Sequence, residues 1–119
     1  MDFSIIIPTW NRSELVEALL QSLHDERSRY ESGRTEVLIV DSSVGYEKES
    51  ILFSCEKYDA IYVEGDDSVR KKRNKGIQLA KYDYILFIDS DVVVKNGLLD
   101  ESVNAYQTPY TVRLGGVLG

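Results

Sequence analysis

The amino-acid sequence predicts an α/β fold with a mainly parallel sheet and helices on both faces, in a Rossmann-like arrangement. Short runs rich in isoleucine, valine and leucine alternate with segments whose apolar residues recur at helical spacing. These short runs are continuously apolar, which is typical of strands buried on both faces of a parallel sheet. Polar turn residues separate the segments. Because strands and helices alternate, the parallel strands are expected to be joined by right-handed crossovers.

The first strand and the first helix are predicted close to the N-terminus. Residues 3–7 form a β-branched run closed by Pro8, which predicts a buried strand. A helix over about residues 12–24 is predicted by its apolar spacing, carried by Leu15, Val16, Leu19, Leu20 and Leu23. Asn11 and Glu14 have the spacing of a capping box at its start. The polar residues 25–34 predict a loop.

Two further strands and two helices are predicted in the middle of the chain. Residues 36–41 repeat the pattern of a buried strand, and residues 46–58 predict a weaker amphipathic helix. A third strand is expected at 60–64, followed by a turn at 65–68 that supplies an N-cap. The helix expected over 69–81 has its apolar stripe, shared with Arg73, at Val69, Gly76, Ile77 and Ala80.

The last predicted elements begin with the most apolar run of the sequence. Residues 84–88 predict the most buried strand of the sheet, which ends at Asp89-Ser90-Asp91. A final helix is expected at about 97–106 and a final strand at about 110–118.

Composition limits the class of protein. The 119 residues match one domain, and 43% hydrophobic with 29% charged residues is the balance of a globular chain. The net charge of -6 argues against duplex nucleic acid or an anionic membrane as a partner. The single cysteine, Cys55, allows no intramolecular disulfide and favours the cytoplasm. No apolar run approaches the roughly 20 residues of a membrane span.

The polar residues with chemical potential cluster at predicted strand ends. In open α/β sheets, ligands bind beyond the carboxyl ends of the strands. The residues that fall at such ends are Thr9, Trp10, Asn11, Asp41, Ser42, Asp89 and Asp91. We therefore expect a ligand site at this edge of the sheet.

Asp89 and Asp91 leave a strand two residues apart, so both side chains can face one cation. Because Mg²⁺ usually shares its ligands between carboxylates, water and substrate phosphate, the pair indicates a metal-diphosphate site. The alternative is a solvated turn.

A basic cluster lies at the start of the predicted helix over 69–81, comprising Arg70, Lys71, Lys72, Arg73 and Lys75. Cations are unfavourable near a helix N-terminus, so either an anionic ligand or the neighbouring Asp66 and Asp67 must compensate. Arg73 is the predicted phosphate contact, because its helical position directs it inward.

Asp41 ends the strand predicted at 36–41. Its carboxylate could bind a base or a ribose hydroxyl, or it could form an Asx-turn.

Four segments, in order, resemble the inverting family 2 glycosyltransferases. The opening strand with Pro8-Thr9-Trp10-Asn11 is similar to that family's first strand and its Pro-Thr-aromatic-Asn signature. Residues 36–43 resemble its second strand and acidic-serine loop, and Arg73-Asn74-Lys75-Gly76 resembles its Arg-Asn-x-Gly helix segment. Residues 84–91 resemble its fourth strand and its Asp-x-Asp metal motif.

The resemblance implies a glycosyltransferase-A fold and the nucleotide-sugar-binding half of an enzyme. It implies that Pro8, Thr9, Asn11 and Asp41 bind the nucleoside, that Arg73 lies near the base or phosphates, and that Asp89 and Asp91 hold the ribose, the diphosphate and a Mn²⁺ or Mg²⁺ ion. The donor would be a nucleoside-diphosphate sugar, with UDP as the expected nucleotide, and the acceptor is open. Val92 and Ser42-Ser43 depart from the acidic residues that the family often has there, which leaves base choice and metal coordination open.

The implied reaction is a single in-line displacement with inversion at the anomeric carbon. The family's general base comes from an acceptor-binding region well beyond the Asp-x-Asp strand, and this sequence ends at Gly119. We therefore expect residues 1–119 to be a single donor-binding domain without that region, completed by further chain, another subunit or a second copy.

Two other functions stay open at this point. A nucleotidyltransferase shares a similar sheet, although it would ordinarily carry a glycine-rich loop after the first strand, where residues 8–12 have no glycine. A non-catalytic interaction domain of the same fold would bind no nucleotide. A dinucleotide-binding oxidoreductase is disfavoured because no Gly-x-Gly-x-x-Gly follows the first strand.

Overall fold

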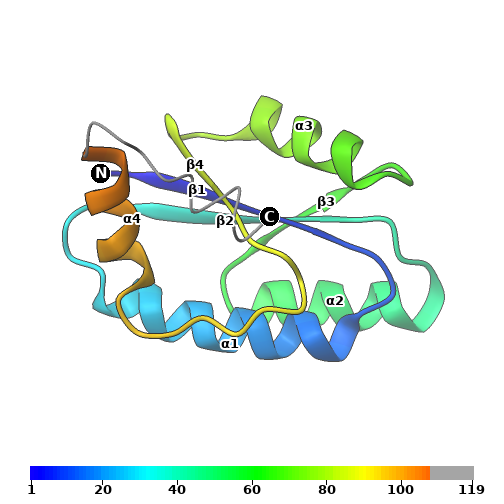
Figure 1. Ribbon diagram of the computed structural model, residues 1–119. Coiled ribbons are helices and arrows are strands. Elements are labelled where there is room, and N and C mark those ends of the chain that lie inside the picture. Colours follow the sequence, from blue (N-terminus) through cyan, green and yellow to red (C-terminus); the bar gives the residue numbers. More distant parts are fainter. Residues whose placement is uncertain (108–119) are drawn as a thin grey trace.

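A computed structural model describes residues 1–107 as a three-layer α/β fold (Figure 1). The sheet has the order β3-β2-β1-β4, and every pair of neighbouring strands is parallel. The strands are β1 Phe3–Thr9, β2 Thr35–Asp41, β3 Ile61–Glu64 and β4 Tyr84–Phe87. The helices are α1 Ser13–Arg29, α2 Gly45–Lys57, α3 Val69–Leu79 and α4 Leu98–Gln107. The predicted fold class is confirmed, while the strand predicted at 110–118 lies outside the described residues.

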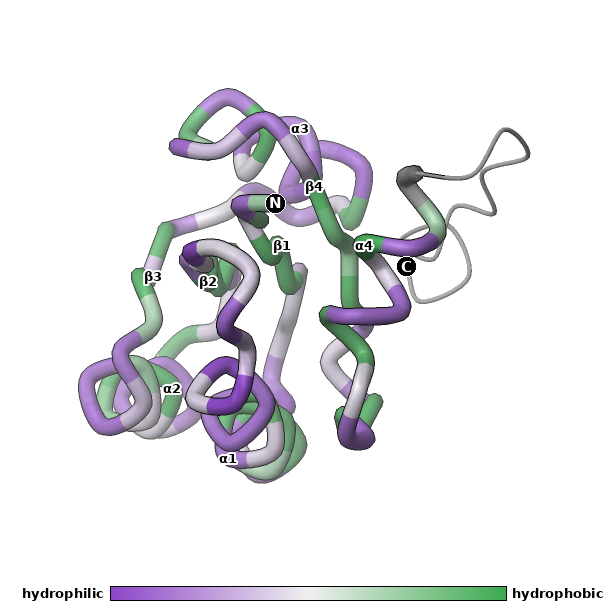
Figure 2. The backbone as a smooth tube through the Cα atoms, turned by 90° about the vertical axis from the view of Figure 1, so that its left-hand side faces the viewer, coloured by the Kyte–Doolittle hydropathy of each residue, from purple (hydrophilic) through white to green (hydrophobic). Residues whose placement is uncertain are grey.

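The helices cover the two faces of the sheet unequally. Helices α1 and α2 lie side by side on one face and α3 lies on the other, as Figures 1 and 2 show. The larger core fills the first of these interfaces and includes Ile5, Ile7, Leu19 and Ile39. The smaller core, beneath α3, is built on Ile6, Leu38 and Val40. Alternate residues of β1 thus serve opposite faces, which explains its unbroken apolar run.

Strand β1, not the segment 84–88, is the most buried strand. All seven residues of β1 are buried, whereas β4 has one buried residue and forms the edge of the described sheet. Apolar content alone misled the prediction, because a partly covered edge strand can be as apolar as a central one.

Helix α1 is longer than predicted. It continues to Arg29 through residues that were expected to form a loop. The extension is held by tertiary contacts: Glu26 is buried, and the Arg27 Nε donates to Thr35 Oγ1 at 2.8 Å. Glu26 accepts from the N–H groups of Gly97 and Leu99, which are distant in sequence, so local polarity predicted the wrong structure.

The capping box predicted at the start of α1 is wrong. Asn11 has a φ of 51°, and the N-cap is Arg12, without a side-chain hydrogen bond. The Ser13 N–H instead donates to Glu47 Oε2 of α2 at 2.9 Å. A neighbouring helix therefore supplies the acceptor, and Asn11 is free to take the left-handed conformation that asparagine tolerates. The N-cap predicted for α3 is confirmed, since Ser68 Oγ accepts from the Lys71 N–H.

Helix α3 packs close to the sheet at Gly76. A Cβ at this position would lie 2.6 Å from Ile6 Cγ2, so only glycine allows this approach. The stripe predicted for this helix is partly wrong, because Val69 and Ile77 are exposed while Lys72 is buried with Gly76. The helix is rotated so that one lysine faces the sheet.

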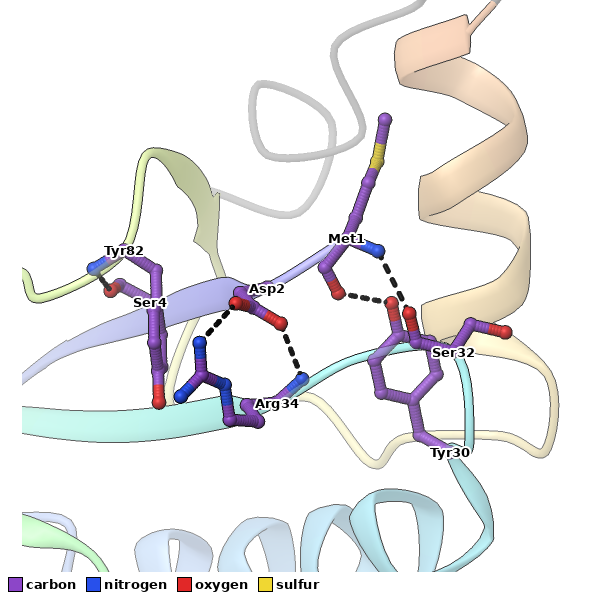
Figure 3. Close-up of polar contacts among 7 residues, drawn as sticks. All are labelled: Met1, Asp2, Ser4, Tyr30, Ser32, Arg34 and Tyr82. Atoms are coloured by element: carbon purple, nitrogen blue, oxygen red, sulfur yellow. Dashed lines mark hydrogen bonds and ion pairs between the residues drawn. The ribbon is translucent and has the colours of Figure 1, made fainter.

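The edge of the sheet where β1 begins is joined by polar contacts (Figure 3). Arg34 binds Asp2 twice, through its N–H at 2.7 Å and its guanidinium at 3.1 Å. The Tyr82 N–H donates to Ser4 Oγ at 3.0 Å, which ties the segment before β4 to β1. The opposite edge, where the parallel strands end, is free for a ligand site. Across residues 1–107, no helix is long and apolar enough to cross a bilayer.

Candidate functional site

A pocket of about 400 Å³ opens at the carboxyl edge of the sheet. Three parts of the chain form its walls: the end of β1 with the loop that follows, the start of α3, and the loop after β4. The lining residues are Pro8, Thr9, Trp10, Arg12, Asp67, Val69, Lys72, Asp89, Ser90 and Asp91. This is the position at which a parallel α/β sheet is expected to bind a ligand.

The Asp-x-Asp pair lies in the loop that directly follows β4. Asp89 is about half-exposed, and its Oδ1 lies 3.6 Å from Arg73 Nη2 of α3. The Arg73 guanidinium also lies over the Phe87 ring, 5.5 Å from its centroid. Arg73 is therefore beside the pocket, held by contacts with both the strand and the acidic loop.

The two carboxylates fit a shared divalent cation better than a cation held by protein alone. Asp89 and Asp91 both line the pocket and offer hard oxygen ligands. Within residues 1–107, no group of three or more His, Cys, Asp or Glu side chains could hold a metal ion. A Mg²⁺ or Mn²⁺ ion at this pair would take its other ligands from water and from a bound phosphate, as Mg²⁺ commonly does.

The end of β1 carries an unsatisfied hydroxyl. Thr9 is 4% exposed, and its Oγ1 has no hydrogen-bond partner among the described residues. Its carbonyl oxygen accepts from Lys72 Nζ at 2.8 Å and from the Ser42 N–H at 3.3 Å. A buried hydroxyl without a partner costs free energy, so Thr9 is poised to accept a contact from a ligand.

Lys72 is the buried cation of the pocket. It is 3% exposed, and burial lowers the pKa of its ammonium while the more distant Asp41 and Asp67 oppose that effect. Gly65 makes room for it, since a Cβ there would lie 2.9 Å from Lys72 Cγ. A buried ammonium is costly unless other groups compensate it.

Asp41 is enclosed by its own neighbours. It is 1% exposed, with Oδ1 accepting from Ser43 Oγ at 2.6 Å and Oδ2 accepting from the Tyr62 hydroxyl at 2.7 Å. Ser43 Oγ in turn accepts from the Asn11 N–H at 2.7 Å. Burial, followed by the hydrogen bond to Asp41, raises the pKa of Tyr62. The carboxylate therefore organises the loops after β1 and β2.

The structure brings some of the predicted site residues together and separates others. Pro8, Thr9, Asp89 and Asp91 line the pocket, and Arg73 contacts its acidic loop. Asn11 and Asp41 do not line the pocket but are linked to each other through Ser43.

Lys72 was not predicted as a pocket residue. A signal for it existed in the sequence, because Lys72 lies four residues before Gly76 and therefore on the same helical face. The position was nevertheless not predicted to be buried, because a lysine is ordinarily expected to be exposed to solvent.

The fold and the pocket together define the chain as a parallel α/β domain of the glycosyltransferase-A fold type, with a candidate ligand site at the carboxyl edge of its sheet. Comparison with solved structures supports this class. The chain superimposes on S. aureus TarS 1-349 in complex with UDP with a TM-score of 0.68, at 24% identity, over 88% of this chain and 32% of that one. It superimposes on the mannosyltransferase PcManGT from Pyrobaculum calidifontis, in complex with GDP-Man and Mn²⁺, with a TM-score of 0.70, at 19% identity, over 90% and 32% of the chains. At these identities the likeness establishes the fold.

The family follows from the sequence. The family model described as Glycosyl transferase family 2 matches residues 4–118, and the chain belongs to this family. It is similar to a chondroitin synthase of Pasteurella multocida, at 34% identity over 75% of this chain and 9% of the relative. It is also similar to the amylovoran biosynthesis glycosyltransferase AmsB of Erwinia amylovora, at 32% identity over 76% and 31%. The chain thus spans less than a third of the length of these two relatives.

Proposed function

We propose that this chain is the donor-binding part of a glycosyltransferase that moves a sugar from a nucleoside diphosphate to an acceptor. The observation that carries the proposal is the pocket at the carboxyl edge of the sheet, which Asp89 and Asp91 line together with the end of β1 and the start of α3. Membership of family 2 supports the same activity. We propose inversion by a single in-line displacement, and dependence on Mn²⁺ or Mg²⁺, as parts of this function.

Different residues of the chain would bind different parts of the donor. Asp89 and Asp91 would hold the cation, which when bound supplies positive charge to the leaving diphosphate. Pro8 and Thr9 would hold the nucleoside against the end of β1. Arg73 would orient Asp89 and add positive charge beside the phosphates.

Asn11 and Asp41 have an indirect role in this proposal. Through Ser43 they fix the two loops that follow β1 and β2, and so keep the nucleoside end of the pocket in shape. None of the described pocket residues is proposed as the general base that takes the acceptor's proton.

UDP is the proposed nucleotide of the donor. Solved neighbours of this fold bind UDP, UDP-GlcNAc and GDP-Man, which supports a nucleoside-diphosphate sugar as the ligand class. The cytoplasm is the proposed compartment, on the strength of the single cysteine.

Calorimetric titration with UDP and GDP tests the proposal. Each nucleotide is added to the 119-residue chain with Mn²⁺ and, separately, with EDTA. We expect binding with Mn²⁺ that is weakened at least about tenfold by EDTA, because the cation bridges the carboxylates and the diphosphate. The double variant Asp89→Ala, Asp91→Ala should lose the Mn²⁺-dependent part of the affinity.

The control variant removes the same charge elsewhere. Asp25→Ala with Asp83→Ala deletes two exposed carboxylates outside the pocket and should bind like the wild type. If the folded wild type binds neither nucleotide, the proposal fails and an interaction domain of the same fold becomes the better hypothesis.

A further inference from the structure

Helix α2 is only weakly amphipathic because it carries apolar side chains on two faces. Ile51 and Cys55 are buried in the larger core. Tyr46 and Phe53 are 81% and 68% exposed. A single exposed apolar side chain is ordinary, but a helix that is apolar on two faces is expected to be covered on both. The described residues cover only one of them.

The exposed face of α2 continues to the edge of the sheet. Strand β3 is an edge strand, and Figure 2 shows α2 and β3 at one margin of the described fold, with α1 on the inner side of α2. A groove of about 510 Å³ lies between them, lined by Leu52, Phe53 and Cys55 of α2 and by Ala60 and Tyr62. The face therefore combines a projecting aromatic side chain with a hollow beside it.

Two opposite charges flank Phe53 on this face. Glu49, Phe53 and Lys57 follow one another at intervals of four residues, so they form a row along one side of α2. Each charged residue lies about 6 Å along the helix axis from Phe53, in opposite directions. Neither forms an ion pair within residues 1–107, and Lys57 Nζ lies 5.2 Å from the ring centroid of the adjacent Tyr58.

A row of acid, aromatic and base is complementary to its own reverse. If the α2 helices of two copies pack antiparallel about a two-fold axis at Phe53, Glu49 of each copy faces Lys57 of the other. A parallel arrangement would instead place Glu49 opposite Glu49. The remaining exposed carboxylate of this face, Glu56, would face the uncharged Ser50 of the second copy. Charge therefore favours a second copy of this chain, in the antiparallel orientation.

We propose that α2 forms the interface of a two-fold symmetric dimer of this chain, in which Phe53 of each copy enters the groove between α2 and β3 of the other and Glu49 pairs with Lys57. Tyr46 then packs beyond the far end of the second helix, where Ile61 is exposed. This groove shares no residue with the pocket at the carboxyl edge of the sheet, so both pockets stay open in the dimer. The interface does not depend on what that pocket binds.

Sedimentation velocity of the 119-residue chain over a range of concentrations tests the proposal. We expect a reversible dimer with a Kd on the order of micromolar, because a contact built on one helix per copy is small. Phe53→Ser should weaken the dimer at least about tenfold, because it removes the central apolar contact. The matched control Leu79→Ser, which removes an exposed apolar side chain from α3, should dimerise like the wild type. Urea unfolding shows that both variants are folded.

Charge reversal tests the antiparallel orientation. Glu49→Lys alone and Lys57→Glu alone place like charges opposite each other, so each should weaken the dimer at least about tenfold. The double variant carrying both substitutions should regain the wild-type Kd. A mixture of the two single variants should form a mixed dimer, because one copy then offers two lysines and the other two glutamates. This rescue does not depend on the stability of the folded chain.

The outcomes decide between this interface and its alternatives. A chain that stays monomeric up to about millimolar concentration overturns the proposal. A dimer that Phe53→Ser leaves unchanged, or one that the double charge reversal does not restore, overturns it as well. A dimer that behaves as expected in a chain that binds neither UDP nor GDP would support this interface and contradict the proposed function.

Discussion

Thr9 shows how a single residue can be suited to binding a ligand at the expense of the stability of the ligand-free protein. Its hydroxyl is buried without a described partner at the end of the most buried strand. Removing an unsatisfied polar group is neutral or stabilising, whereas removing a satisfied one is destabilising. The sign of the stability change therefore distinguishes a site residue from a structural one.

We predict opposite effects for the same substitution at two threonines. Thr9→Val should leave the free energy of unfolding unchanged or raise it by about 1 kcal/mol, and should weaken UDP binding several-fold. Thr35→Val should lower the free energy of unfolding by about 1 kcal/mol, because it removes the side-chain oxygen that accepts from Arg27 Nε. Urea unfolding followed by titration with UDP measures both quantities, and a destabilised Thr9→Val that binds normally would contradict the prediction.

The sequence predicted the site residues to the extent that position at a strand end determines them. Thr9, Asp89 and Asp91 line the pocket because parallel strands end at one edge. Asp41 also lies at a strand end, but Ser43 and Tyr62 occupy its carboxylate, and contacts of that kind between loops leave no periodic pattern. Lys72 was missed because its burial depends on the rotation of α3, which Gly76 and Ile6 set in three dimensions.

At the scale of elements, two helices are capped by carboxylates from other helices. Glu47 of α2 accepts from Ser13 at the start of α1. Glu26 of α1 accepts from the Gly97 N–H at 3.0 Å and from the Leu99 N–H at 2.8 Å at the start of α4. A negative charge is favourable at a helix N-terminus, so each contact orients one helix on its neighbour.

One face of α1 also holds the segment that follows the Asp-x-Asp pair. Ser22 Oγ accepts from the Val94 N–H at 3.0 Å, and Arg29 donates to Asn96 Oδ1 at 2.7 Å. With Glu26 between them, these side chains fix the path from Asp91 to α4, which Figure 1 shows running along α1. The helix thereby positions the acidic loop without touching the pocket.

Glu26→Ala tests this arrangement. Two backbone N–H groups, that of Leu99 buried and that of Gly97 partly buried, would lose their acceptor, so the free energy of unfolding should fall by about 2–3 kcal/mol. The acidic loop should also lose its fixed path, which predicts weaker Mn²⁺-dependent binding of UDP in protein that is still folded. Urea unfolding and calorimetry measure the two effects. Glu17→Ala, on the exposed side of the same helix, should change the free energy of unfolding by less than about 0.5 kcal/mol.

Element types were predictable because the buried strands are continuously apolar and the helices, of which α2 is only weakly amphipathic, have apolar residues at helical spacing. Boundaries were less predictable where a distant side chain decides them. The end of α1 depends on Glu26 and Arg27, whose partners lie in β2 and in the segment before α4. Burial of β4 was overestimated because strand order, which places it at the edge of the described sheet, is not encoded in its own composition.

At the scale of the whole molecule, acidic side chains join elements that are distant in sequence. Asp2 binds Arg34 across the start of β1 and β2, Glu47 binds Ser13 at α1, and Glu64 binds Lys48 of α2. Hydrogen bonds from these partners lower the pKa of all three carboxyl groups. The two ion pairs are exposed and individually weak, but together the three contacts link five elements, namely β1, β2, β3, α1 and α2.

These shifts predict how stability depends on pH. A carboxyl group whose pKa is lower in the folded than in the unfolded state stabilises the protein above its unfolded pKa, and this stabilisation is lost as the pH falls through the folded pKa. The ordinary values are 3.8 for Asp2 and 4.5 for Glu47 and Glu64. These contacts should therefore add to the free energy of unfolding at neutral pH, and this contribution should be lost below about pH 4.5.

Glu47→Gln isolates one of these contributions. The amide cannot ionise, so the variant should be less stable than the wild type at neutral pH, and the difference should shrink below about pH 4.5 as Glu47 is protonated in the wild type. Urea unfolding of both proteins between about pH 7 and about pH 3.5 measures this difference. Glu56→Gln removes an exposed carboxylate from the same helix and should follow the wild-type curve. A gap between Glu47→Gln and the wild type that stays constant over the whole range would mean that the carboxylate acts at α1 only as a hydrogen-bond acceptor, without a contribution from its charge.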